Sequence, residues 1–283
     1  MLQKNMSNLL KKIFEKISYI KRYLLIQLNV NFGYPYHYFG KKITASKETY
    51  LEIYASSKNK TFPIIDEFEK KYEFKIDKSW LNDLALHTQV TIKKSKINYQ
   101  HGRILYSCLA KYLKENDNVN ILETGTSKGF SALCMSKALK DLNKNGTILT
   151  IDILPHDFKM FWNSIDDHEG QKTRKELLSK WDSYLNNINF LTGKSEKILK
   201  KLQIERVNFC FLDAVHKLKD LKFEFEFVSK RQSAGDLIIF DDVTEQTFNE
   251  VVEFVKNLER KKNYKITYLN SSEERGYAIA EKL

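Results

Sequence analysis

The sequence contains few residues that break or cross-link a chain, with three prolines, ten glycines and three cysteines among 283 residues. Together with a hydrophobic fraction of 42%, this composition excludes a fibrous or disordered protein. No run approaches about 18 uninterrupted apolar residues, so we expect no transmembrane helix. The N-terminus lacks the apolar core and small-residue cleavage site of a signal peptide. The length suits one large domain with an appendage.

The three cysteines, Cys108, Cys134 and Cys210, lie in apolar stretches and do not have the spacing of metal ligands. We expect them to be small buried side chains in a reducing compartment. This usage agrees with a cytoplasmic protein.

Positive charge is unevenly distributed along the chain. The net charge is +11, and residues 1–60 hold 11 Lys and Arg against three Asp and Glu. The remainder is therefore only slightly basic. Because an enzyme that acts on nucleic acid should be basic around its catalytic site, we expect no nucleic-acid partner.

Residues 7–29 have the pattern of an amphipathic helix. Its apolar residues recur at steps of three and four: Leu10, Ile13, Ile17, Ile20, Leu24 and Leu28. The helix could pack against the chain or a second copy, giving a homo-oligomer, or lie on an anionic membrane surface; nucleic acid is a third option. Residues 31–40 are rich in aromatic side chains and could cover a site or simply pack.

From residue 118 onwards, apolar runs alternate with helical patterns. We expect strands at 119–124, 147–153, 188–192, 207–213 and 236–241, and helices at 128–141, 171–184, 195–203, 217–231 and 245–260. Such alternation predicts an α/β fold with a parallel, doubly wound sheet covered on both faces. Two final strands, 264–269 and 276–281, have no helix between them and predict an antiparallel hairpin. Before residue 118, helices are expected at 65–72, 80–86 and 101–115.

We expect two units in this chain. Residues 1–85 form a basic, mainly helical extension, and residues 86–283 form the α/β domain.

A glycine loop follows the first strand, with the spacing Glu123-x-Gly125-x-x-x-Gly129. Glycine lets the backbone approach a ligand closely, and the helix behind the loop offers unpaired N–H groups. The G-x-G-x-x-G spacing of NAD-dependent dehydrogenases is absent. The loop resembles motif I of class I S-adenosylmethionine-dependent methyltransferases, whose sheet also ends in an antiparallel hairpin. The resemblance implies a Rossmann-like, seven-stranded, mostly parallel sheet and S-adenosylmethionine as the cofactor.

The resemblance also implies cofactor contacts at the carboxyl ends of the strands. The loop residues expected to cradle the amino-acid part of the cofactor are Glu123, Gly125, Thr126, Ser127 and Gly129. Asp152 ends a buried apolar run, where an unpaired carboxylate is costly, and is expected to accept the ribose hydroxyls. Gly193 and Ser195 stand where the family contacts adenine, although Ser195 is equally well explained as a helix N-cap.

Acidic residues end the next two strands: Asp213 follows one apolar run, and the pair Asp241-Asp242 follows the other. Three neighbouring carboxylates repel one another, and a hard cation such as Mg²⁺ removes that cost. The pattern resembles metal-dependent O-methyltransferases of the macrocin or sugar type and, more distantly, of the catechol type. The resemblance implies that these acids bind Mg²⁺ and that Asp213 also contacts the cofactor. The alternative is a helix cap at Asp241 or Asp242 with no metal.

A catalytic base is expected after the fourth strand. Relatives often have Asp-Gly-Asp-His where this chain has Asp213-Ala-Val-His216. Because Val215 replaces the second acid, His216 is the leading base, with Asp213 as the other catalytic residue. A helix-start histidine without a role is the alternative.

The connection 154–170 is longer than an ordinary βα loop, and such loops are often functional. It is expected to form an acceptor wall or lid, or else a small structural insertion. The candidate acceptor contacts are His156, Trp162, Asn163, Asp166, Asp167 and His168.

The sequence thus predicts an O-methyltransferase that uses S-adenosylmethionine and Mg²⁺ on a small polyhydroxylated acceptor, a sugar or glycosylated metabolite. A rival hypothesis is that the protein has this fold but is catalytically inactive. It would then be a nucleotide-binding scaffold that docks through its basic N-terminal helix. A base N-methylating enzyme is disfavoured, because 212–215 lacks the Asp-Pro-Pro-Tyr type of signature.

Overall fold

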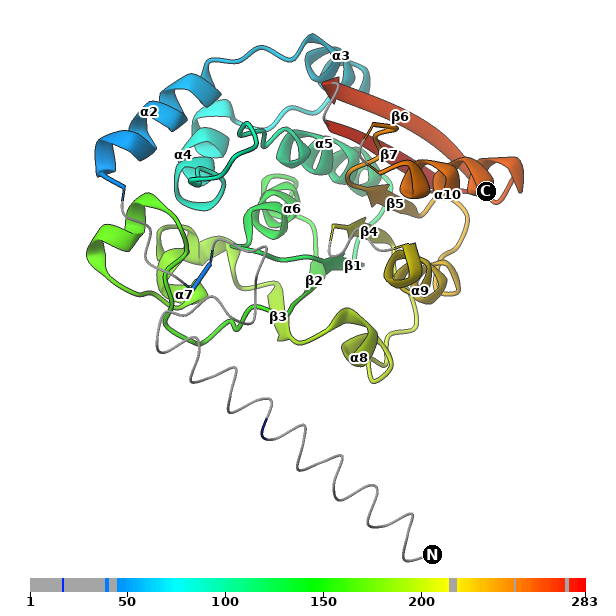
Figure 1. Ribbon diagram of the computed structural model, residues 1–283. Coiled ribbons are helices and arrows are strands. Elements are labelled where there is room, and N and C mark those ends of the chain that lie inside the picture. The colour runs from blue at the N-terminus through cyan, green and yellow to red at the C-terminus, as the bar shows by residue number, and fades with distance from the viewer. Residues whose placement is uncertain (1–16, 18–38, 41–44, 214–217, 247, 273–274) are drawn as a thin grey trace, which may run out of the picture.

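The computed structural model describes residues 17, 39–40, 45–213, 218–246, 248–272 and 275–283. A seven-stranded sheet with the order β3-β2-β1-β4-β5-β7-β6 lies at its centre (Figure 1). The strands are β1 (Val119–Thr124), β2 (Gly146–Asp152), β3 (Ile188–Thr192), β4 (Phe209–Leu212), β5 (Leu237–Phe240), β6 (Tyr264–Ser272) and β7 (Arg275–Lys282). The pairs among β1–β5 are parallel, and β7 pairs antiparallel with both β5 and β6. The predicted doubly wound sheet with its C-terminal hairpin is confirmed.

Helices cover both faces of the sheet, with α5 and α6 on one side and α8 and α9 on the other (Figure 1). Their bounds are α5 (His101–Leu113), α6 (Phe130–Asp141), α8 (Ser195–Leu199), α9 (Leu218–Ser229) and α10 (Asn249–Arg260). The strands alternate between the two cores: Ile121 and Phe211 face α5 and α6, whereas Leu122 and Cys210 belong to the core on the other side. This two-sided burial explains why the strands are continuous apolar runs.

Three N-terminal helices extend the core on the α5 side: α2 (Lys47–Lys58), α3 (Pro63–Tyr72) and α4 (Lys78–Thr88). The Asp77 side chain caps α4 by accepting the Trp80 N–H at 2.6 Å, and Pro63 begins α3. Phe68 and Leu84 lie in the same hydrophobic cluster as Ile121. The expected boundary at residue 85 therefore runs through α4 and through a continuous core.

One expected helix is wrong. Residues 171–184 form a short α7 (Arg174–Leu177) and a 3₁₀ segment, η2 (Ser179–Tyr184), with non-helical backbone at Trp181. Leu177, Leu178 and Trp181 are all buried. These positions would share one face of a regular helix as well, so the apolar pattern predicts a continuous helix here and does not reveal the kink.

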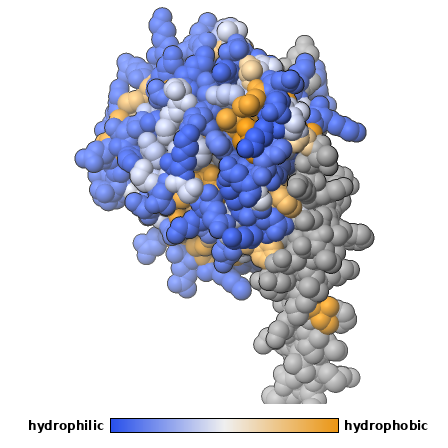
Figure 2. All heavy atoms as spheres, turned by 90° about the vertical axis from the view of Figure 1, so that its left-hand side faces the viewer, coloured by the Kyte–Doolittle hydropathy of each residue, from blue (hydrophilic) through white to orange (hydrophobic). Residues whose placement is uncertain are grey.

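The N-terminal helix expected over 7–29 lies outside the described residues except for Ile17, and only Phe39 and Gly40 of the aromatic segment are described. Within the described parts of the chain, no helix is long and apolar enough to cross a membrane. The side of the molecule that carries α2 and α7 is mainly hydrophilic, with scattered apolar patches (Figure 2). Cys108, Cys134 and Cys210 are buried and unpaired, as expected.

Candidate functional site

The glycine loop connects β1 to α6 at the carboxyl edge of the sheet. Gly125 and Gly129 have φ values of 97° and 93°, which only glycine adopts readily. A Cβ on Gly129 would also lie 2.9 Å from a methyl carbon of Leu178. The Gly125 N–H donates to the Ile151 carbonyl at 2.9 Å, which joins the loop to the end of β2. Both glycines are thus required by backbone geometry.

Glu123 lies behind this loop and is fully buried. Its carboxylate accepts hydrogen bonds from the hydroxyls of Ser131 and Thr150, and Thr150 contacts Thr126 at 2.5 Å. Burial raises the pKa of Glu123 to about 7, although the two hydroxyls partly oppose this shift. Glu123 therefore supports the loop from inside.

Asp152 ends β2 and holds two backbone segments. Its carboxylate accepts the Ser127 N–H at 2.5 Å and the Leu154 N–H at 2.8 Å. Each carboxylate oxygen has a second lone pair, so the group can accept further hydrogen bonds. Asp152 is only partly buried and lines a cavity. A ligand with adjacent hydroxyls could therefore bind it.

Arg174 supports the loop from the other side and was not predicted from the sequence. Its guanidinium donates to the Ser127 carbonyl at 2.9 Å and to the Leu154 carbonyl at 3.3 Å. Burial lowers its pKa to about 10, so it stays protonated at neutral pH. Arg174 and Asp152 thus bind the same two backbone segments. Arg174 donates to their carbonyl groups, and Asp152 accepts from their N–H groups.

The cavity has a volume of about 360 Å³ and lies where the carboxyl ends of β1 to β4 meet. Six of the predicted cofactor residues line it: Gly125, Ser127, Asp152, Gly193, Ser195 and Asp213. Glu123, Thr126 and Gly129 are not among its lining residues, and their contact with a cofactor stays a prediction. The described end of the aromatic segment, Phe39, also lines the cavity.

The predicted N-cap role of Ser195 is wrong. Lys194 is the N-cap residue of α8, no side chain caps this helix, and Ser195 is its first residue. The Ser195 hydroxyl instead lies close enough to Glu224 to oppose the rise in the pKa of Glu224 that burial causes. Ser195 is therefore placed between the cavity and α9.

The three predicted acids do meet at neighbouring strand ends. Leu212 of β4 pairs with Phe240 of β5, and the Asp241 N–H donates to the Leu212 carbonyl at 3.2 Å. Asp213 follows directly, and burial together with the nearby Asp241 raises its pKa well above the ordinary range. Asp213 also lines the cavity, so the acids and the cavity are continuous.

A cation from elsewhere in the chain already contacts two of these acids. Arg275 Nη1 lies 2.9 Å from Asp241 Oδ2 and 2.7 Å from Asp242 Oδ1. Lys93, in the segment before α5, is also near enough to interact electrostatically with all three acids. Burial lowers the pKa of Lys93, and Arg275 lowers it further, while the acids oppose both effects. Neither Arg275 nor Lys93 was predicted from the sequence as a partner of these acids.

These residues do not fit the predicted Mg²⁺ site as they are arranged. Within the parts of the chain that the structure describes, no three His, Cys, Asp or Glu side chains are placed to hold a metal ion. A cation bound by Asp213, Asp241 and Asp242 would have to share Asp241 and Asp242 with the Arg275 guanidinium. We therefore assign no step of the reaction to a metal.

The proposed base His216 lies in 214–217, outside the described residues. A different histidine, His101 at the start of α5, lies beside the acids and stacks on Phe211 with ring centroids 6.1 Å apart. Burial lowers its pKa to about 4, so His101 is neutral at physiological pH. The neutral ring can donate one hydrogen bond and accept another, but it brings no charge.

The 154–170 connection is mainly a structural insertion. Asn163 accepts hydrogen bonds from the Tyr50 hydroxyl at 3.1 Å and from the Ile92 N–H at 2.9 Å. Trp162 is buried and donates to the Lys172 carbonyl at 2.7 Å. These bonds attach the insertion to α2 and to the segment before α5. The side chains of Trp162 and Asn163 are therefore committed to the fold, and their predicted acceptor contacts have no support here.

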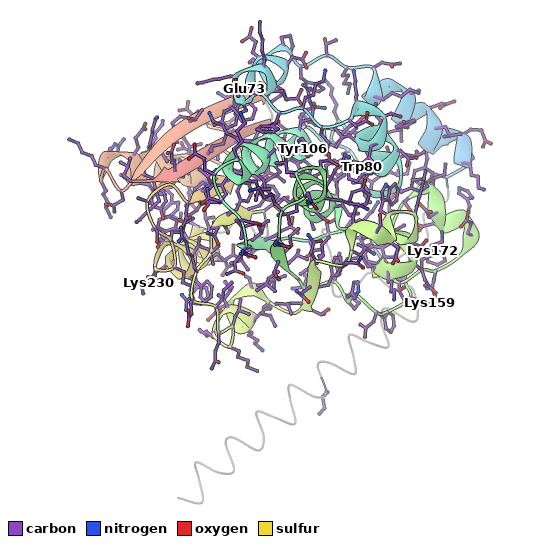
Figure 3. The ribbon with its side chains drawn as sticks, turned by 180° about the vertical axis from the view of Figure 1, so that it is seen from behind. Glu73, Trp80, Tyr106, Lys159, Lys172 and Lys230 are labelled. Atoms are coloured by element: carbon purple, nitrogen blue, oxygen red, sulfur yellow. The ribbon has the colours of Figure 1, made fainter. Side chains whose placement is uncertain are left out.

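Charged residues fasten the rest of the insertion, which includes the 3₁₀ turn η1 (Ile165–Glu169). Asp166 pairs with His87 Nδ1 at 2.7 Å and with Lys172 at 3.2 Å. Lys159 and Lys172 both project from this part of the molecule, far from Lys230 on the opposite side (Figure 3). Lys128 of the glycine loop donates to the Asn163 carbonyl at 3.0 Å. The insertion thus braces the cofactor loop directly.

Residues 122–243 match the family model of a methyltransferase domain. No curated protein sequence matches the chain. The matched residues run from β1 to the loop after β5 and include every lining residue of the cavity described above except Phe39.

Solved structures share the fold. The O-methyltransferase TomG from Streptomyces achromogenes is 16% identical over 74% of this chain and 91% of its own, with a TM-score of 0.53. An O-methyltransferase from Bacillus cereus is 18% identical over 74% of this chain and 92% of its own, with a TM-score of 0.52. Cofactor-bound Rv0187 from MTB is 15% identical over 79% of this chain and 98% of its own, with a TM-score of 0.53. Residues 122–243 thus match a methyltransferase domain, and the chain has the Rossmann-like fold of these solved methyltransferase structures.

Proposed function

We propose that this class I methyltransferase transfers a methyl group from S-adenosylmethionine to a hydroxyl of a small polyhydroxylated acceptor, with a sugar-like molecule as the first candidate. The main support is the continuity of one cavity from the Asp152 carboxylate to the Asp213 carboxylate. One end suits the cofactor, and the other end offers the oxygen acceptors that hydroxyl groups require.

The cofactor half rests on Gly125, Ser127 and Asp152. Backbone of the glycine loop lies at the cavity wall without side chains in the way, so a ligand can approach it closely. Asp152 keeps lone pairs for the ribose hydroxyls, and its orientation is fixed by the two N–H groups that it already accepts. Gly193 and Ser195 are assigned to the adenine end.

The acceptor half rests on Asp213. The acceptor oxygen attacks the methyl carbon in line, the carbon–sulfur bond breaks, and S-adenosylhomocysteine leaves. The hydroxyl proton must pass to a base, for which Asp213 and His216 are the candidates. The raised pKa of Asp213 makes its carboxylate a stronger base than an ordinary aspartate. Orienting the two substrates can contribute up to roughly 7–11 kcal/mol to the acceleration.

The first test is calorimetric titration of the protein with S-adenosylhomocysteine. We expect saturable binding that Asp152→Asn weakens about 10- to 100-fold, because a charged acceptor of hydroxyl hydrogen bonds is replaced by a neutral one. Asp182→Asn is the matched control, since Asp182 is exposed on η2 and away from the cavity. If the wild type does not bind, the scaffold hypothesis replaces ours.

The acceptor class is tested by transfer of a labelled methyl group to panels of glycosides and catechols. We expect incorporation into glycosides. Incorporation into catechols alone would contradict the sugar-like acceptor while leaving the methyltransferase assignment intact.

A further inference from the structure

The acid pair at the end of β5 has a partner built into the fold. Arg275 begins β7, the strand that pairs antiparallel with β5, with Phe240 opposite Ala278. This register brings the first residue of β7 alongside the residues that follow β5. One guanidinium nitrogen then contacts a carboxylate oxygen of Asp241 and one of Asp242 at 2.9 and 2.7 Å.

Gly276 fixes this approach. The Val243 N–H donates to the Gly276 carbonyl at 2.9 Å, and a Cβ on Gly276 would lie only 2.2 Å from the Val243 carbonyl oxygen. No other residue allows β7 to come so close to the segment after β5. The contact that positions Arg275 is therefore between backbones and does not depend on flexible side chains.

The surroundings strengthen the case for an internal cation. Asp241 and Asp242 are both buried, and buried carboxylates need a compensating charge. Lys93 adds a second positive charge within electrostatic reach of Asp213, Asp241 and Asp242. A divalent cation at the acid pair would face repulsion from both Arg275 and Lys93.

We infer that Arg275 takes the position that a divalent cation would occupy at these acids, so that methyl transfer by this chain needs no metal. Arg275 acts as a positioning residue: it orients Asp241 and neutralises the pair, which leaves Asp213 to face the acceptor. The inference rests on the proposed function for its catalytic meaning, but the contact itself is tested without turnover.

Binding of Mn²⁺, followed by its electron paramagnetic resonance signal, tests the inference directly. We expect no saturable Mn²⁺ binding to the wild type or to Arg275→Lys, which keeps the charge. Arg275→Gln should bind one Mn²⁺ at least about tenfold more tightly than the wild type, because the repelling charge is gone and the carboxylates remain. Asp241→Asn added to Arg275→Gln should abolish this gain.

Arg206→Ala is the matched control, because Arg206 also pairs with a buried acid, Asp236, at 2.9 Å, but at the other end of β5. It should leave Mn²⁺ binding unchanged. Stoichiometric Mn²⁺ binding by the wild type overturns the inference, and this result does not depend on whether any variant folds. Titration of the same samples with S-adenosylhomocysteine separates the two proposals, since lost cofactor binding counts against the proposed function alone.

Discussion

Glu123 is fully buried, and hydrogen bonds from the hydroxyls of Ser131 and Thr150 hold its carboxyl group in place. Burial raises its pKa from 4.5 to about 7. The folded chain therefore retains a proton that the unfolded chain releases above its ordinary pKa. The stability contribution is fully present at low pH and is lost as the pH rises from about 4.5 to 7.

Glu123→Gln should remove this pH dependence, because the amide does not ionise. The difference in unfolding free energy between wild type and variant should change by roughly 3 kcal/mol across that range. Urea denaturation at a series of pH values measures it. Glu205→Gln, at an exposed position, serves as the control. Parallel pH profiles for wild type and Glu123→Gln would show that Glu123 is not the source.

At the scale of single residues, the sequence pattern predicted the acids of the site but not the basic residues that contact them. Asp152, Asp213 and Asp241 were found because each ends an apolar run, and the ends of parallel strands share one edge. Arg174 and Arg275 lie in polar segments where a charge looks like ordinary surface. Their contacts depend on tertiary packing, which leaves no local pattern.

At the scale of elements, the side-chain amide of Asn163 joins the 154–170 insertion to two other segments. Asn163 adopts a left-handed conformation, with φ of 51°, and bonds both to Tyr50 of α2 and to the backbone of Ile92. Asparagine tolerates this backbone better than most residues do. The side chain thus connects three segments that are distant in the sequence.

Asn163→Ala should cost about 2–4 kcal/mol of unfolding free energy, because it leaves buried backbone groups without partners and strains the turn. Tyr50→Phe, which removes one hydroxyl only, should cost about 1 kcal/mol. Urea denaturation measures both. Equal losses in the two variants would mean that the Ile92 contacts contribute little.

Elements were predicted best where burial alone determines them. The predicted strand bounds agree with the structure to within a few residues. In a sheet covered on both faces, a short apolar run between polar turns indicates a buried strand and its ends. The helix expected over 171–184 is interrupted at Trp181, and the periodic pattern cannot show this because Leu178 and Trp181 would share one face of a regular helix too. The N-cap at Ser195 failed for a related reason: its hydroxyl lies near Glu224, a tertiary neighbour.

At the scale of the whole molecule, α2 to α4 and the sheet share one hydrophobic cluster that includes Ile65, Leu81 and Phe211. Removing residues 1–85 would expose the α5 side of this cluster to water. We expect such a chain to lose cooperative thermal unfolding, whereas a chain that begins at residue 45 retains α2 to α4.

Circular dichroism during heating distinguishes the two truncated chains. A sharp transition in the chain that lacks residues 1–85, at the temperature of the intact protein, would show that the sheet folds independently of these helices.

The strand order also has a consequence for the gene. The last strand in sequence, β7, is not at the edge of the sheet but lies between β5 and β6. A premature stop codon just before residue 275 would delete the eight residues of β7 from the interior of the sheet, leaving β6 without its partner and one edge of β5 unpaired. It would also remove the arginine that contacts Asp241 and Asp242. Nonsense and frameshift mutations just before the codons for β7 should therefore be as damaging as those before the codons for the central strands.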